Sequence, residues 1–150
     1  MSAEAVTGLR YVEEVSEGDA LPPLTKAIST VQMMMYGAAT WDFMRIHYDT
    51  DYARDKGFPQ AFVDGQMLGA FLAQLVVDWA GDPGALRRLS LRYRNFAFPG
   101  DTVTCSGHVT RLLIEGDEAL AECEVVAANQ HGEIIAGPAL AIVALAQRDK

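Results

Sequence analysis

The residues best suited to acid–base chemistry lie in the segment from Trp41 to Asp49. Asp42 and His47 stand five positions apart within it, among large apolar side chains. A carboxylate and an imidazole held close together can take and give protons, as general acid–base catalysis requires. Residues five apart on an α-helix point about 140° away from each other, so the pair can act together only if the backbone bends between them. We therefore expect irregular backbone here.

A long buried helix is predicted directly after this segment. It opens at Asp64-Gly65 and ends before Gly81-Asp82-Pro83-Gly84. Its apolar residues cover most of the circumference, which is typical of a helix buried nearly all round. Such a helix needs a sheet that wraps it or a second subunit that covers part of it. The apolar residues are Met67, Leu68, Ala70, Phe71, Leu72, Leu75, Val76, Val77 and Trp79.

Two shorter helices are expected upstream. Ser29 or Thr30 can cap the first, over residues 31–39, and Asp49 or Thr50 can cap the second, over residues 51–56. Gly57 suits the left-handed position that ends the second helix. The first helix carries a methionine-rich face, which we interpret as core packing rather than a ligand surface. That face consists of Val31, Met34, Met35 and Ala38.

The remainder alternates apolar and polar residues, as half-buried strands do. Residues 86–96, 102–114, 119–128 and 134–146 form four such stretches, separated by turn residues. Long strands joined by tight turns make an antiparallel meander. One buried helix beside such a sheet is an α+β arrangement, and we expect a single domain over residues 1–150.

Composition excludes several classes of protein. The net charge is −8, which disfavours nucleic acid and anionic membrane surfaces as partners. No apolar run reaches the roughly 20 residues of a membrane span. Residues 1–10 lack the pattern of a signal peptide, so a cytoplasmic protein is expected.

Neither a metal ion nor a redox cofactor is expected. Cys105 and Cys123 are isolated thiols, which we interpret as small buried apolar residues. No Cys/His spacing predicts zinc, and no glycine-rich loop predicts a bound phosphate cofactor. His108 and His131 have no partner signature. We expect His131 to lie in a solvent-exposed turn and His108 to be a surface or packing residue of a strand.

Several motifs together resemble the MaoC-like, (R)-specific enoyl-CoA hydratase family. Asp42 and His47 match the two fixed positions of its D-x-N-P-x-H signature. The stretch at residues 63–67, Val-Asp-Gly-Gln-Met, resembles its I-A-H-G-M entry into the long helix, and Pro99-Gly100-Asp101 resembles its late P-G-D turn. The likeness runs from Gly18 to Asp101, which is more than half of the chain. It departs from the family at Trp41, Met44, Arg45 and Asp64, which replace a common Gly, the Asn-Pro pair and a common His.

The resemblance implies a hot-dog fold, in which a curved antiparallel sheet wraps a long central helix. It also implies a hydratase or dehydratase whose Asp42 and His47 hold the water that adds to the β-carbon of an enoyl thioester. The backbone N–H of Gly65, at a helix N-terminus, would meet the developing charge on the thioester oxygen. Asp64 and Gln66 are expected to contact substrate. Coenzyme A would enter as part of the substrate, with no separate cofactor.

An arginine cluster offers a candidate for binding the phosphates of coenzyme A. Arg88, Arg92 and Arg94 would share one face of a strand, because side chains repeat every two residues. Arg suits phosphate geometry, so a clamp is one interpretation. The solvated face of an amphipathic strand is an equal alternative.

Two other functions stay open from the sequence. The chain could be a non-catalytic or partner-dependent subunit that binds acyl-CoA. It could also be an acyl-CoA thioesterase, with an acid on the long helix or supplied by a partner. Asp78 is the candidate on the helix, but its place near the helix C-terminus favours a hydrogen-bonded or interface residue instead. In each case an oligomer is expected because a free sheet edge needs cover. The partner would be an identical chain, in a dimer or larger assembly, or a related hot-dog chain.

Overall fold

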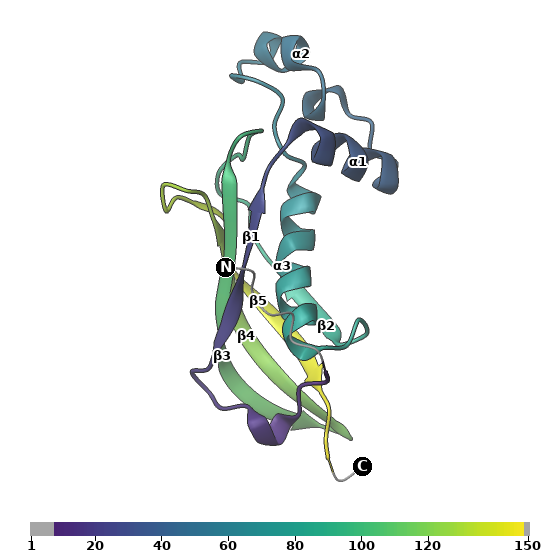
Figure 1. Cartoon of the computed structure of the whole chain (residues 1–150), viewed down its shortest axis with the longest axis vertical. Coiled ribbons are helices and arrows are strands. Elements are labelled where there is room, and N and C mark those ends of the chain that lie inside the picture. The colour runs from purple at the N-terminus through teal and green to yellow at the C-terminus, as the bar shows by residue number, and fades with distance from the viewer. Residues whose placement is uncertain (1–7, 149–150) are drawn as a thin grey trace.

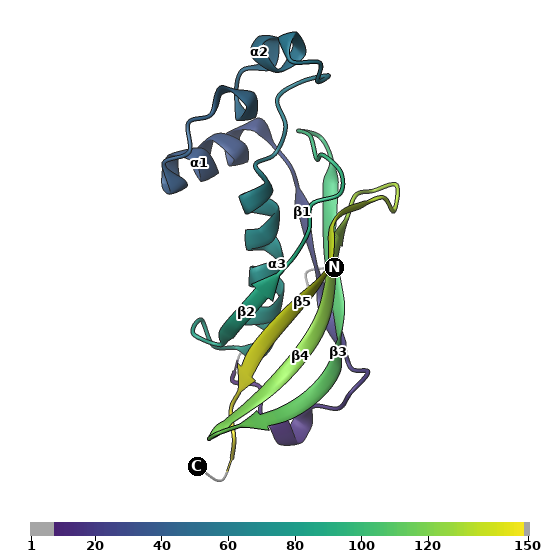
Figure 2. The same cartoon turned by 180° about the vertical axis from the view of Figure 1, so that it is seen from behind.

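The computed structural model describes residues 8–148. Part of the N-terminal segment for which we expected no signal peptide, residues 1–7, lies outside this range. Five antiparallel strands form one sheet in the order β1-β3-β4-β5-β2. The sheet curves around helix α3 and does not close into a barrel (Figure 1, Figure 2). The strands are β1 (Ala20–Ala27), β2 (Leu86–Ser90), β3 (Thr102–Glu115), β4 (Glu118–Ala128) and β5 (Ile134–Leu145). The expected α+β arrangement is confirmed.

The meander of β3, β4 and β5 supplies the inner face of the sheet. Its inward side chains are buried and alternate with partly exposed ones along each strand. Cys105 and Cys123 lie on this inner face as free, buried thiols, as expected. The buried side chains of this inner face form one hydrophobic core with those of helix α3.

The predicted strand over residues 86–96 is too long, because β2 ends at Ser90. Ser90 pairs with Leu140 of β5, whereas Tyr93 forms only an isolated bridge to Ala136. Pro138 lies between these two partners and has no N–H to donate, so the regular ladder cannot continue past it. The residue that ends the pairing lies in β5, so the sequence of residues 86–96 could not indicate where β2 ends.

Helix α3 (Gly65–Ala80) follows its predicted bounds. The side chain of Asp64 caps its start, and Gly81 adopts the left-handed conformation after its end, with φ of 72°. Most of its surface is buried against the sheet, and each large apolar side chain buried there contributes about 1.5–3 kcal/mol. One stripe stays exposed, so the expectation that Ala70 is buried is wrong. The stripe repeats every four residues and consists of Gln66, Ala70, Gln74 and Asp78.

Helix α1 (Thr30–Thr40) begins after Ser29, whose hydroxyl accepts a hydrogen bond from the Gln32 N–H at 3.1 Å. Its methionine-rich face is not core, which corrects the sequence interpretation. Met34 and Met35 are 59% and 68% exposed, and Met33 is the buried residue of the helix. The reason is position: α1 lies beyond one end of α3, away from the sheet that could have covered it (Figure 1).

The segment after α1 is irregular, as the spacing of Asp42 and His47 required. Trp41 takes a left-handed conformation with φ of 60°, and the 3-10 turn η2 (Arg45–His47) follows. Helix α2 (Thr50–Asp55) then begins after Asp49, which caps it and also pairs with Arg45 at 2.7 Å. A further 3-10 turn, η1 (Val12–Glu14), precedes β1. Among the described residues, no helix is long and apolar enough to span a membrane.

Candidate active site

The bend between α1 and η2 brings three titratable side chains to the start of α3. A ring nitrogen of His47 and one carboxylate oxygen from each of Asp42 and Asp64 all lie within 4.8 Å of one another. Each of the three side chains is partly buried. The sequence predicted the first two as a pair, and the fold adds the third.

Asp42 is positioned by the end of helix α1. Its N–H donates to the carbonyl of Gly37 at 2.9 Å, which closes the last turn of the helix around the left-handed Trp41. Its carboxylate oxygen Oδ1 accepts from the Met44 N–H at 3.1 Å. The acid therefore emerges from a backbone that is fixed on both sides.

His47 is oriented by the segment that leads into α3. Its Nδ1 lies 2.9 Å from the carbonyl oxygen of Phe62, and the Phe62 ring packs edge-on against the imidazole. A carbonyl can only accept, so Nδ1 carries the hydrogen and the neutral ring keeps its lone pair on Nε2. His47 can therefore act as a base through Nε2.

Asp64 joins the pair because it caps α3. Its Oδ1 accepts from the Gln66 N–H at 2.8 Å, as an N-cap side chain does. Its Oδ2 is buried and has no hydrogen-bond partner among the described residues. From the sequence, Asp64 was expected only to contact substrate. The one sequence signal that indicated its position was its place at the start of the long helix.

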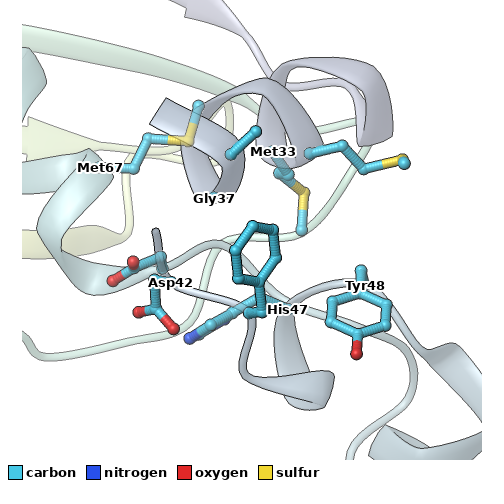
Figure 3. Close-up of a pocket in the computed structure, with 10 residues that line it drawn as sticks. Met33, Gly37, Asp42, His47, Tyr48 and Met67 are labelled. Atoms are coloured by element: carbon cyan, nitrogen blue, oxygen red, sulfur yellow. The ribbon is translucent and has the colours of Figure 1, made fainter. Parts of the chain in front are cut away.

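An apolar cavity of about 280 Å³ opens above these three groups. Figure 3 shows the Asp42 carboxylate beside the His47 ring, with side chains of α1 and α3 across the cavity. A polar floor under apolar walls is the usual arrangement of a small-molecule site. The walls are formed by Met33, Met34, Gly37, Ala38, Phe43, Tyr48 and Met67.

Gly65 borders a second hollow, of about 240 Å³, and does not line the first. The Tyr93 ring packs against it so closely that a Cβ on Gly65 would lie 3.1 Å from Tyr93 Cζ. The N–H of the first helical residue has no partner inside a helix and carries the positive end of the helix dipole. This N–H can therefore serve a developing anion. Phe62, Phe96 and Arg94 also line this hollow.

The negative charge of Asp64 affects the pKa values of two tyrosines, Tyr36 and Tyr93. Burial raises the pKa of Tyr36, and the negative charges of Asp64 and Asp42 and the neighbouring Tyr93 raise it further. Burial, followed by the charge of Asp64, raises the pKa of Tyr93. Both phenols therefore stay protonated around the acids at neutral pH.

The other predicted site residues lie apart from this cluster. Arg88 and Arg92 are exposed and line neither hollow. Arg94 borders the second hollow, but its Nε donates to the Gly137 carbonyl at 2.7 Å. Gln66 is exposed and supplies a backbone N–H to Asp64. Asp78 is 14 residues further along α3, about 21 Å along its axis, so it cannot reach the pair.

His131 is exposed, as expected, and His108 is exposed as well. The fold brings together a group of possible metal ligands that the spacing of residues in the sequence did not indicate. Asp42, His47 and Asp64 offer one imidazole and two carboxylates at distances that could hold a cation. Local spacing missed the cluster because Asp64 is far from the pair along the chain.

The sequence matches the family described as MaoC like domain over residues 13–133. The beta subunit of 3-oxo-4,17-pregnadiene-20-carboxyl-CoA hydratase from Mycobacterium tuberculosis is 30% identical over 132 residues, covering 88% of this chain and 96% of that subunit. The peroxisomal enoyl-CoA hydratase 2 of Arabidopsis thaliana is 26% identical over 91 residues, covering 59% of this chain and 28% of that protein.

Solved structures share the fold. The (R)-hydratase from A. caviae involved in PHA biosynthesis superposes with a TM-score of 0.80 at 24% identity, over 90% of this chain and 100% of that one. A chain of the ChsH1-ChsH2 complex from Mycobacterium tuberculosis superposes with a TM-score of 0.74 at 30% identity, over 89% of this chain and 98% of that one. The hot-dog architecture expected from the sequence is confirmed.

Proposed function

Because this chain belongs to the MaoC-like family, we propose that it adds water to the double bond of an enoyl-CoA thioester, or removes water in the reverse direction. One observation carries the proposal above the others. A carboxylate oxygen of Asp42 and a ring nitrogen of His47 lie within 4.8 Å of each other beside an apolar cavity, and the contact of Nδ1 with the Phe62 carbonyl leaves Nε2 free to accept a proton. The named relatives are hydratases of CoA thioesters.

The chemistry needs a base, a proton donor and a site for negative charge. Water is a poor nucleophile at neutral pH, so Asp42 and His47 take one of its protons as its oxygen bonds to the β-carbon. The π electrons move to the thioester, the α-carbon receives a proton from the pair, and the double bond becomes a single bond. The charge that develops on the thioester oxygen is met by the Gly65 N–H at the start of α3.

The cavity sets the size of the group that reacts. A volume of about 280 Å³ is at the small end of ligand pockets, too small for a whole acyl-CoA. We assign it to the acyl group, which would lie against the methionines of α1 and α3, and coenzyme A would stay outside. Methionine is flexible and polarisable, so these walls can adapt to apolar groups of different shapes.

Loss of enoyl-thioester absorbance tests the proposal. Purified protein is mixed with crotonyl-CoA and then with a bulkier enoyl-CoA, such as the pregnadiene thioester named for the mycobacterial relative. Loss that disappears in Asp42→Asn is the expected result. If a folded wild-type protein consumes none of these substrates, it is not a self-sufficient hydratase.

A partner-dependent subunit is the second candidate, and a surface feature favours it. Trp41, Phe43 and Met44, in the segment after α1, are 82%, 56% and 62% exposed, and Phe43 also lines the cavity. An exposed apolar patch of this kind marks a binding surface. One relative is a beta subunit, and another similar chain comes from a two-protein complex. Size-exclusion chromatography with light scattering tests for a homodimer, and restored activity on adding a related hot-dog chain tests for a heterodimer.

A further inference from the structure

The two oxygens of the Asp64 carboxylate have different surroundings. Oδ1 accepts from the Gln66 N–H at 2.8 Å and completes the N-cap of α3. Oδ2 is buried and has no hydrogen-bond partner among the described residues. A buried carboxylate oxygen without a donor is costly, so the fold places at this point an acceptor that a bound molecule can satisfy.

Asp42 and His47, which lie within 4.8 Å of a carboxylate oxygen of Asp64, supply acceptors rather than donors. His47 already uses its Nδ1 hydrogen on Phe62, which leaves a lone pair on Nε2. Asp42 already accepts the Met44 N–H at Oδ1. Its carboxylate, like that of Asp64, has no hydrogen to give when ionised. The three groups therefore surround a point where a molecule with two hydrogens to donate would be held from several sides.

We propose that Asp64 is a third catalytic residue, which holds the attacking water through Oδ2. This inference rests on the proposed hydratase function. One hydrogen of the water makes a hydrogen bond to Oδ2 of Asp64 and stays bonded to the water oxygen, so that it becomes the hydroxyl hydrogen of the product. The other is taken as a proton by the Asp42–His47 pair as the oxygen bonds to the β-carbon. The pair returns a proton to the α-carbon, so water is added without a net change in the charge of the enzyme. With both hydrogens engaged, a lone pair of the water is left to face the cavity.

The capping role and the catalytic role of Asp64 can be separated by substitution. Asn caps helices about as well as Asp, because its side-chain oxygen accepts the same backbone N–H. Asp64→Asn therefore keeps the cap but replaces the second acceptor by an amide N–H₂ group. A matched control exists at Asp82, whose Oδ1 accepts the Gly84 N–H at 2.8 Å with the same two-residue spacing, outside the cluster.

The test compares wild type, Asp64→Asn, Asp82→Asn and Asp42→Asn with crotonyl-CoA and a longer enoyl-CoA. We expect kcat to fall by about 10²-fold in Asp64→Asn, with KM little changed, because the lost contact acts on water and not on the thioester. The acid limb of its pH–rate profile should also change, since one carboxylate of the cluster is gone. Melting temperatures of Asp64→Asn and wild type should agree, and Asp82→Asn should match wild type in all respects. A crystal structure should place a water within hydrogen-bond distance of Oδ2.

Each contrary result has a distinct meaning. If Asp42→Asn is inactive while Asp64→Asn stays within about threefold of wild type, the role of Asp64 is refuted and the hydratase function stands. If wild type consumes no enoyl-CoA, the proposed function falls and the inference with it. If a chelator abolishes activity and a divalent cation restores it, the three groups are metal ligands, and the water-holding role is refuted.

Discussion

His47 Nδ1 lies 2.9 Å from the carbonyl oxygen of Phe62, and this contact determines which imidazole nitrogen is free to accept a proton. The substitution His47→Asn separates the two ring nitrogens, because the Asn amide can still donate to Phe62 but has no counterpart of Nε2. We expect kcat to fall by about 10²–10⁴-fold while the melting temperature stays close to that of wild type.

The complementary measurement is His47→Ala, which removes both nitrogens and the packing against the Phe62 ring. It should be as inactive as His47→Asn but melt at a lower temperature. Substantial activity in His47→Asn would show that the imidazole only holds the loop in place.

Gly37 is expected to control the position of Asp42. A Cβ at Gly37 would lie 2.8 Å from the carbonyl oxygen of Asp42, closer than such atoms approach. In an ordinary helix Gly→Ala stabilises by about 0.5–1 kcal/mol, so the sign of the effect is informative. We expect Gly37→Ala to lower both the melting temperature and, by about tenfold or more, kcat, because the carboxylate is displaced with its backbone.

The control for this variant is Ala39→Gly, at an exposed position two residues along the same helix. It should lose stability through helix propensity and keep its activity. A Gly37→Ala variant that is more stable and fully active would show that the end of α1 can move without disturbing Asp42.

Local signals explain what the sequence could predict. The caps at Ser29, Asp49 and Asp64 depend on a side chain and an N–H two or three residues away, so they can be identified from short stretches. The bend between Asp42 and His47 follows from helix geometry alone. The fold class follows from one long apolar helix and several strands with alternating apolar and polar residues. Both patterns of apolar residues can be recognised within short stretches of the sequence.

Contacts between distant segments explain what it could not. The exposure of Met34 and Met35 depends on where α1 lies relative to the sheet, and helical spacing says nothing of that. The end of β2 at Ser90 depends on Pro138 across the ladder. The position of Asp64, the third titratable group of the site, depends on α3 beginning beside the loop that carries Asp42 and His47. The local signal therefore identified a helix cap and did not indicate the cluster.

The acyl cavity should be narrowed by Ala38→Phe. Ala38 lines the cavity from α1, whereas its neighbour Ala39 does not, so Ala39→Phe is the matched control. We expect kcat/KM for a long enoyl-CoA to fall by about tenfold or more in Ala38→Phe, since lost apolar contacts of this size discriminate substrates at that level. The value for crotonyl-CoA should change little. Equal losses for short and long substrates would place the acyl group elsewhere.

The thiols of Cys105 and Cys123 should be unreactive toward thiol reagents in the native protein. Burial raises the pKa of the Cys105 thiol to about 11 and that of the Cys123 thiol to about 12. Because the thiolate is the reactive form, a thiol reagent should titrate neither at neutral pH until the protein is unfolded. The same reagent can therefore measure coenzyme A released by a thioesterase activity without background from the enzyme. Reaction of folded protein in the absence of substrate would show that the core opens readily.

Stability should decline at alkaline pH because of the tyrosines beside Asp64. The pKa of Tyr93 is raised above its ordinary value of 10.0 by burial and then by the charge of Asp64. A raised folded-state pKa means that the stability contribution is complete below pH 10 and is lost as the pH rises through the higher folded value. We expect the midpoint of urea unfolding to fall above pH 10, and Tyr93→Phe to make that fall shallower. Phenolate absorbance should show fewer late-titrating groups in the variant. An alkaline limb identical to that of wild type would mean that Tyr93 ionises without resistance from the fold, and that its ring does not share the electrostatic environment of Asp64.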